Sequence, residues 1–119
     1  MSYVDGFVLP VPEKNLADYK RIARKAGKIW REHGAIEYIE CVGDDLRQKG
    51  SSTFKRMSKL KAGEKVLFSW IVYKSRAHRD RVVAKVMKDP RLADVMTPAN
   101  TPFDVKRMAY GGFKPLVKL

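Results

Sequence analysis

Apolar and polar residues alternate at the start of this chain and then change to a longer period. From Ser2 to Val11 the side chains alternate between two faces, which predicts a strand. Pro10 and Pro12 end this strand because neither can donate a hydrogen bond to a neighbouring strand. From Leu16 to His33 apolar residues recur every three or four positions, which predicts a helix of about five turns. Gly34 then supplies the left-handed residue that commonly ends a helix.

The middle of the chain combines two strand patterns with a long polar connection. Ala35 to Val42 alternates and predicts a second strand. Lys65 to Tyr73 is rich in Val, Ile, Phe, Trp and Tyr, and both of its faces are largely apolar, so this third strand should be covered on both sides. The connection from Gly43 to Glu64 is polar and basic and too long for a hairpin turn. Apolar residues three apart after Thr53 predict a short helix inside it.

The last third of the chain repeats the change from helical to strand period. Ser75 to Lys88 predicts a second helix, and the Asp-Pro pair that follows it opens one further short turn through Met96. Thr97 to Asp104, with two prolines, is expected to be a loop. Val105 to Phe113 predicts the last strand, which contains a pair of glycines near its end.

The order β-α-β-β-α-β is the ferredoxin-like arrangement, an α+β fold with two helices on one face of an antiparallel sheet. The whole chain, residues 1–119, is expected to form one such domain. The opposite face of the sheet would expose aromatic and aliphatic side chains of the third strand. Because a large exposed apolar patch is unusual in a monomer, a second copy should cover it. The sequence therefore predicts a homodimer packed sheet to sheet.

The chain is strongly basic, with 25 Lys and Arg against 13 Asp and Glu, a formal net charge of +12. These charges are spread over the predicted helices, the middle loop and the end of the chain. A spread of this kind favours a solvated surface, and an anionic small ligand or nucleic acid are the alternatives. The third strand lacks the basic residues that accompany the aromatic residues of RNA-binding strands. Any nucleic-acid binding is therefore expected to be non-specific.

Three features of the sequence indicate the cellular compartment of the protein. Cys41 is the single cysteine, which suits a reducing environment and excludes an internal disulfide. The first residues have no basic start and no long apolar core, so no signal peptide is expected. The longest nearly apolar run, Val66 to Tyr73, is far shorter than the ~20 residues of a membrane helix. We expect a cytoplasmic protein that makes no contact with membranes.

Six stretches carry a resemblance to a known family: YVDGF at 3–7, WREHGA at 30–35, FSWI at 68–71, KDPR at 88–91, PFD at 102–104 and KRMAYGGF at 106–113. They resemble the bacterial family called domain of unknown function 1428, in the dimeric α+β barrel superfamily. The resemblance covers the whole chain and implies the fold and the dimer. It implies no particular reaction. The superfamily also includes cofactor-independent monooxygenases of aromatic compounds and haem-degrading enzymes. The middle loop, with Lys55 and Arg56, is more basic than the family pattern.

The usual catalytic and nucleotide-binding motifs are missing from the sequence: there is no GxGxxG, P-loop, GxSxG, CxxC or HExxH. His33 is expected to interact with the carboxyl end of the first helix, and His78 to lie on the surface at the start of the second. Cys41 is expected to be a small buried hydrophobic residue. We therefore expect neither a metal site nor a cofactor.

Charged residues inside strands are the best candidates for a binding site. Asp5 and Arg107 lie in the first and last strands, which are neighbours in a ferredoxin-like sheet, so the two side chains are expected to pair. They form either a structural ion pair or part of a mostly apolar cavity with a few polar groups. The candidate ligand-binding set is Asp5, Phe7, Glu40, Trp70, Arg107 and Tyr110.

Three functions remain open at this point. The leading hypothesis is a binder of a small anionic or aromatic molecule, or a cofactor-independent enzyme acting on one, monooxygenase-like only by analogy with the superfamily. The second is a non-specific nucleic-acid-binding protein, suggested by the positive charge. The third is an interaction or structural dimer that binds no ligand. A closed cavity lined by polar groups would favour the first.

Overall fold

The computed structural model describes residues 2–50, 53–95, 97 and 101–119. Its centre is a four-stranded antiparallel sheet in the order β2-β3-β1-β4. The strands are β1 (Tyr3–Pro12), β2 (Glu37–Val42), β3 (Glu64–Tyr73) and β4 (Ala109–Phe113). The helices are α1 (Leu16–Glu32), α2 (Phe54–Met57), α3 (Arg76–Lys88) and α4 (Pro90–Val95), with 3-10 turns at Glu13–Asn15 and Val105–Arg107. The predicted β-α-β-β-α-β order is confirmed; Met96, the predicted end of the turn after α3, and part of the predicted 97–104 loop lie outside the described residues.

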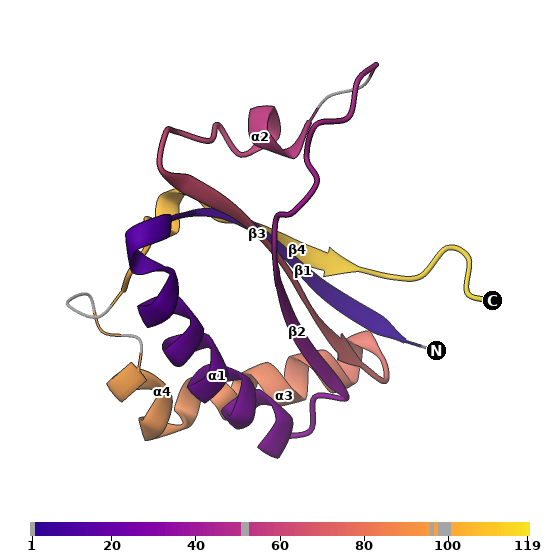
Figure 1. Cartoon of the computed structure of the whole chain (residues 1–119). Helices are drawn as coiled ribbons and strands as arrows, with labels where there is room; N and C mark the ends of the chain where they lie inside the picture. The colour runs from indigo at the N-terminus through magenta and orange to yellow at the C-terminus, as the bar shows by residue number, and fades with distance from the viewer. Residues whose placement is uncertain (1, 51–52, 96, 98–100) are drawn as a thin grey trace.

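Helices α1, α3 and α4 lie on the same side of the sheet (Figure 1). The alternation of β1 and β3 turns one set of side chains toward these helices, and the broad apolar stripe of α1 faces them. The core consists of buried residues from β1, β3, α1 and α3: Tyr3, Leu9, Val11, Leu67, Ile71, Tyr73, Tyr19, Ile22, Ala26, Ile29, Val82 and Val86. Gly34, with φ of 118°, ends the first helical segment in the left-handed region, as predicted.

The other face of the sheet is apolar and only partly covered. The strand registers place Ile39 opposite Trp70, and Val4 opposite Phe113, on this face. Phe68 is 43% exposed here, and its ring meets Phe54 of α2 edge to face at 5.9 Å. The short helix α2 therefore shields one end of the face and leaves the rest open. We call this surface the open sheet face.

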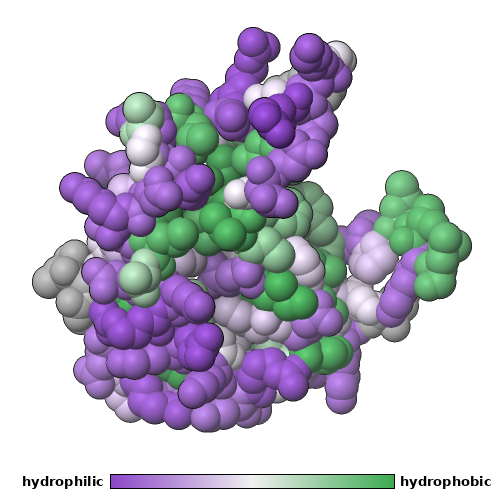
Figure 2. All heavy atoms as spheres, in the orientation of Figure 1, coloured by the Kyte–Doolittle hydropathy of each residue, from purple (hydrophilic) through white to green (hydrophobic). Residues whose placement is uncertain are grey.

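The carboxy-terminal segment, residues 114–119, leaves β4 and projects away from the sheet (Figure 1). Its apolar residues Leu116, Val117 and Leu119 are exposed, and they form the projecting hydrophobic end in Figure 2. None of the helices in the described ranges is long and apolar enough to cross a membrane.

Three expectations about local structure are wrong. The first strand does not end at Pro10 but runs to Pro12, because β4 pairs with β1 only as far as Val8 and the prolines need donate no hydrogen bond on that side. The last strand begins at Ala109 rather than Val105, because Asp104 accepts a hydrogen bond from the Lys106 amide and starts a 3-10 turn instead. Cys41 is exposed rather than buried, because it lies on the open sheet face of the edge strand β2, opposite Phe68.

Candidate functional site

A groove runs between α1 and the edge strand β2. Its volume is about 860 Å³, within the range of small-molecule sites. Ala23 and Gly27 of α1 and Val42 of β2 give it small, apolar walls. β2 is the edge strand of the sheet, and the groove is lined by α1 on one side and by β2 and Leu67 of β3 on the other. The space is therefore open to solvent along the edge of the sheet.

Gly27 determines how closely β2 approaches α1. A Cβ atom added at Gly27 would lie 2.7 Å from the Tyr38 ring, which is closer than real contacts allow. The Tyr38 ring thus occupies the space that any other residue at position 27 would fill. Trp30, one turn further along α1, flanks the same ring at a centroid distance of 6.3 Å.

The polar centre of the groove is Glu40. The Tyr19 hydroxyl of α1 donates a hydrogen bond to Glu40 Oε1, and the Tyr38 hydroxyl donates to Oε2 at 2.7 Å. Burial and then the charge of Glu40 raise the pKa of both tyrosine hydroxyls, so the phenols stay protonated at neutral pH. No Lys or Arg of the described residues forms an ion pair with Glu40. The carboxylate is held in place by two neutral donors and keeps lone pairs for a further donor.

Four cations line the helix side of the groove. Lys20, Arg24, Lys28 and Arg31 all come from α1. Their spacing of four, four and three residues places them in one row along the helix. Figure 2 shows hydrophilic residues gathered over this helix. The row gives this side of the groove a positive potential. Within the described part of the chain no three His, Cys, Asp or Glu side chains gather as metal ligands would.

The six predicted binding residues do not share one site. Glu40 lies in the groove. Phe7 and Tyr110 stack with ring centroids 5.9 Å apart on the helix side of the β1–β4 pair. Trp70 lies on the open sheet face, where its indole N–H donates to Glu37 at 2.8 Å. The expectation that Trp70, Phe7 and Tyr110 surround one cavity is wrong. Trp70 lies opposite Gly6, and successive residues of a strand face opposite sides, so Trp70 is on the other face from Phe7 and its partner Tyr110.

The predicted pair of Asp5 and Arg107 is also wrong. Asp5 is 7% exposed, and its carboxylate accepts from Arg79 of α3 at 3.2 Å. Burial raises the Asp5 pKa, and the charge of Arg79 partly opposes this. Arg107 instead donates to Glu64 at the start of β3, at 2.9 Å for one of its two bonds. The register of β4 against β1 places Gly112, not Arg107, opposite Asp5.

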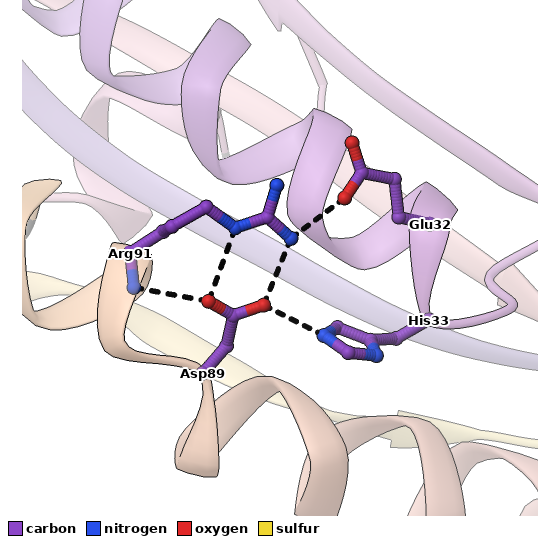
Figure 3. Close-up of polar contacts among 4 residues, drawn as sticks. All are labelled: Glu32, His33, Asp89 and Arg91. Carbon is purple, nitrogen blue, oxygen red and sulfur yellow. Dashed lines mark hydrogen bonds and ion pairs between the residues drawn. The ribbon is translucent and has the colours of Figure 1, made fainter.

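The two histidines belong to the helix ends. His33 Nε2 lies 2.8 Å from Asp89, and Arg91 binds both Asp89 and Glu32 (Figure 3). This cluster joins the end of α1 to the corner between α3 and α4. His78, near the start of α3, is half-buried and accepts a hydrogen bond from the Lys74 amide at 3.0 Å.

Tyr19 and Tyr38 are the groove residues that sequence reasoning missed. Tyr38 precedes Glu40 by two positions and so lies on the same face of its strand. Tyr19 belongs to the apolar stripe of α1, and its ring is buried in the core while its hydroxyl reaches Glu40. The sequence signal for the Glu40 centre is a tyrosine two residues before a carboxylate, on the strand face that points toward the helices. A second tyrosine in the apolar stripe of the facing helix completes this signal.

The sheet order and the helices on one face define the ferredoxin-like α+β class of protein. A family model described as "Protein of unknown function (DUF1428)" matches residues 2–105. The chain belongs to this family. It is 39% identical over 117 residues to the uncharacterized protein YbaA of Escherichia coli strain K12, with 98% of each chain covered.

Solved structures with the same fold are more distant. An uncharacterized NIPSNAP domain protein from Burkholderia xenovorans matches with a TM-score of 0.56 and 13% identity, over 95% of this chain and 93% of that one. SnoaB, a cofactor-independent oxygenase from Streptomyces nogalater, matches with a TM-score of 0.56 and 14% identity, over 99% and 96% of the two chains. At these identities the likeness establishes the fold alone.

Proposed function

We propose that this protein binds a small aromatic anion in the groove between α1 and β2. The observation that carries the proposal is the Glu40 carboxylate, oriented by two tyrosine hydroxyls inside a groove of about 860 Å³. Glu40 is half-buried. A carboxylate with a fixed position and free lone pairs is suited to accept a hydrogen bond from a ligand.

Each part of the groove matches one part of such a ligand. The walls formed by Leu16, Ala23 and Val42 suit an apolar ring. The cations Arg24 and Lys28 suit its anionic group. Glu40 accepts a hydrogen bond from a ligand hydroxyl. This contact is directional, unlike the apolar contacts with the walls and the charge attraction of the cations.

The test is titration of the protein with 6-hydroxy-2-naphthoate, a fluorescent aromatic acid that carries one hydroxyl. We expect saturable one-to-one binding. Glu40→Gln should weaken it about ten-fold or more, because a hydrogen bond to a charged group contributes roughly 1.5–3 kcal/mol. The matched control is Glu37→Gln, the same change on the same strand but on the open sheet face, where Glu37 binds Trp70.

Binding that falls equally in Glu40→Gln and Glu37→Gln would contradict the proposal, since it would place the ligand elsewhere or reveal a general loss of structure. Circular dichroism of both variants separates these two causes. An absence of binding at millimolar probe would also contradict it.

A second candidate is a cofactor-independent enzyme at the same groove. Glu40 is placed to accept a proton from a bound aromatic, and the fold resembles that of a cofactor-independent oxygenase. The test is oxygen uptake with anthrone, which is oxidised by one O₂ to anthraquinone and one water. Catalysis would be supported by oxygen uptake that is faster than the rate without protein. This excess should be lost in Glu40→Gln and kept in Glu37→Gln. Uptake that equals the rate without protein excludes catalysis for this substrate.

The proposed assembly is a homodimer that pairs the open sheet faces of two copies. The support is the partly exposed apolar surface around Ile39, Phe68 and Phe113. The proposed location is the cytoplasm, supported by the single cysteine.

A further inference from the structure

The row of cations on α1 is longer than one anionic group requires. Lys20 and Arg31 bound the row, and Arg24 and Lys28 lie between them. At 1.5 Å per residue, neighbours in the row are about 5 to 6 Å apart along the helix axis, and the whole row spans about 16 Å. All four side chains line the groove.

These four cations have no carboxylate partner among the described residues. The acids of α1 are used elsewhere: Asp18 lies 3.8 Å from Arg21, and Glu32 binds Arg91 at 2.6 Å. By contrast, the half-buried arginines on other elements, Arg79 and Arg107, each have a carboxylate partner. The groove lining also contains the carboxylates Glu32 and Glu40, so its four cations outnumber its acids, and none of the four forms an ion pair among the described residues.

Like charges four residues apart on a helix repel one another and destabilise it. Lys20 and Arg24 form one such pair, and Arg24 and Lys28 form the next. A ligand that carries anionic groups at a similar spacing relieves this repulsion at two places at once. A ligand with a single anionic group relieves it at one.

We infer that the ligand of this groove carries at least two anionic groups spaced along an elongated aromatic body. The body lies parallel to α1 against the apolar walls, with its anionic groups beside the cation row and its hydroxyl at Glu40. The chemical class is an aromatic dianion whose charged groups are carboxylate, sulfonate or phosphate. This inference rests on the proposed function and specifies its ligand.

The test compares two fluorescent probes with the same ring and hydroxyl: 6-hydroxynaphthalene-2-sulfonate, with one sulfonate, and 3-hydroxynaphthalene-2,7-disulfonate, with two. At about 50 mM salt we expect the disulfonate to bind at least ten-fold more tightly. At about 0.5 M salt the advantage should shrink to less than three-fold, because screening at that ionic strength acts within a few ångströms. Equal affinities at low salt would overturn the dianion inference and leave the proposed function standing. An absence of binding by both probes would overturn both.

Paired variants test whether the row itself is responsible. Arg24→Gln with Lys28→Gln should remove the advantage of the disulfonate. Arg21→Gln with Lys25→Gln is the matched control: the same helix, the same spacing and the same change in net charge, at exposed positions outside the groove lining. The control should keep the advantage within two-fold of the unmodified protein.

Equal losses in the two double variants would overturn the inference, because the probe would then respond to the overall charge of the protein. Twenty-residue oligodeoxythymidine is the competitor. The oligonucleotide could displace the disulfonate in a way that depends on Arg24 and Lys28 but not on Arg21 and Lys25. That result would assign the row to nucleic acid and would also overturn the small-dianion inference.

Discussion

Gly27 shows how one absent side chain shapes the groove. A helix interior normally disfavours glycine by about 1 kcal/mol relative to alanine. Here the glycine is retained where a Cβ would meet the Tyr38 ring at 2.7 Å. The same contact brings the Tyr38 hydroxyl to Glu40. Local helix stability is therefore given up for the position of the tyrosine.

Gly27→Ala is predicted to destabilise the protein by about 1 kcal/mol, because overpacking of about 1–3 kcal/mol exceeds the gain in helix propensity. It should also weaken binding of 6-hydroxy-2-naphthoate. In a Tyr38→Ala background the same substitution should instead stabilise the protein, since the obstructing ring is gone. Urea unfolding at one fixed protein concentration measures both effects. The same sign in the two backgrounds would contradict this account of Gly27.

Asp5 is a buried charged residue, and its ion pair with Arg79 lies beside the core residue Tyr3. Arg79→Met is predicted to cost about 3–5 kcal/mol at pH 7, because it leaves the buried carboxylate without a partner. Arg81→Met, at an exposed position of the same helix, should have little effect.

The pH dependence of Arg79→Met provides the check. Burial already raises the Asp5 pKa, and removal of Arg79 raises it further. A raised pKa means that the folded state holds its proton more tightly, so the penalty is absent when the group is protonated and grows as the pH rises through the folded pKa. The destabilisation should therefore shrink between pH 7 and pH 4. A loss that is independent of pH over this range would show that Asp5 is not the stranded group.

At the scale of elements, the periodicity of the sequence was sufficient for most of the fold. The strands β1, β2 and β3 and the helices α1, α2 and α3 lie where alternation and helical spacing placed them. The start of β4 was predicted four residues early. Val105 is apolar and predicts the start of the strand, but Asp104 caps a 3-10 turn there, and a side-chain cap of this kind competes with strand formation.

The wrong partner of Asp5 has a separate cause, the register of β4 against β1, which places Gly112 opposite Asp5. With Arg107 outside the strand, its side chain reaches Glu64 rather than β1. The true partner of Asp5 comes from α3, 74 residues away in the sequence. Contacts of this kind depend on how a helix is rotated over the sheet, which the spacing of apolar residues specifies only coarsely. Glu40 could be predicted as a candidate, whereas its tyrosine partners needed the packing of α1 on β2.

The junction between α1, α3 and α4 is predicted to be sensitive to acid. Hydrogen bonds from Arg91 and then His33 hold the pKa of Asp89 well below its usual range. A lowered pKa adds stability above the unfolded-state pKa of about 3.9, and this stability is lost as the pH falls through the folded value. Asp89→Asn should lower the thermal midpoint at pH 7, and the difference from the unmodified protein should narrow as the pH falls toward 2.

Asp94→Asn, an exposed carboxylate on the same short helix α4, is the matched control and should leave the midpoint nearly unchanged at pH 7. Thermal melts followed by circular dichroism at pH 7, 5, 3 and 2 compare the three proteins. A constant difference between Asp89→Asn and the unmodified protein at all four values would exclude the ionised carboxylate as the cause.

At the scale of the whole molecule, the sheet separates the groove on its helix side from the proposed dimer contact, which is the open sheet face. The groove lies on the helix side of the sheet, so pairing of two open faces would leave it accessible. A standard interface buries about 800 Å² per partner, which a four-stranded face can supply. The projecting segment 114–119 adds further apolar surface next to β4.

Light scattering after size exclusion is predicted to give about twice the 13.6 kDa chain mass at micromolar concentration. Ile39→Glu places a charge on the open sheet face and should give a monomer, because a buried unpaired carboxylate strongly disfavours the interface. Met87→Glu, on the exposed side of α3, is the control and should remain a dimer. A monomeric unmodified protein would contradict the proposed assembly but would not affect the groove.

The location of the ligand is the central claim, and amide chemical-shift mapping tests it most directly. Addition of 6-hydroxy-2-naphthoate to the isotope-labelled protein is predicted to shift the amides of α1 from Leu16 to Glu32 and of β2 from Tyr38 to Val42. The amides of Phe68, Trp70 and Gly111, on or beside the open sheet face, should stay in place. Shifts centred on those three residues, or on Phe7 and Tyr110, would contradict the assignment of the groove as the binding site.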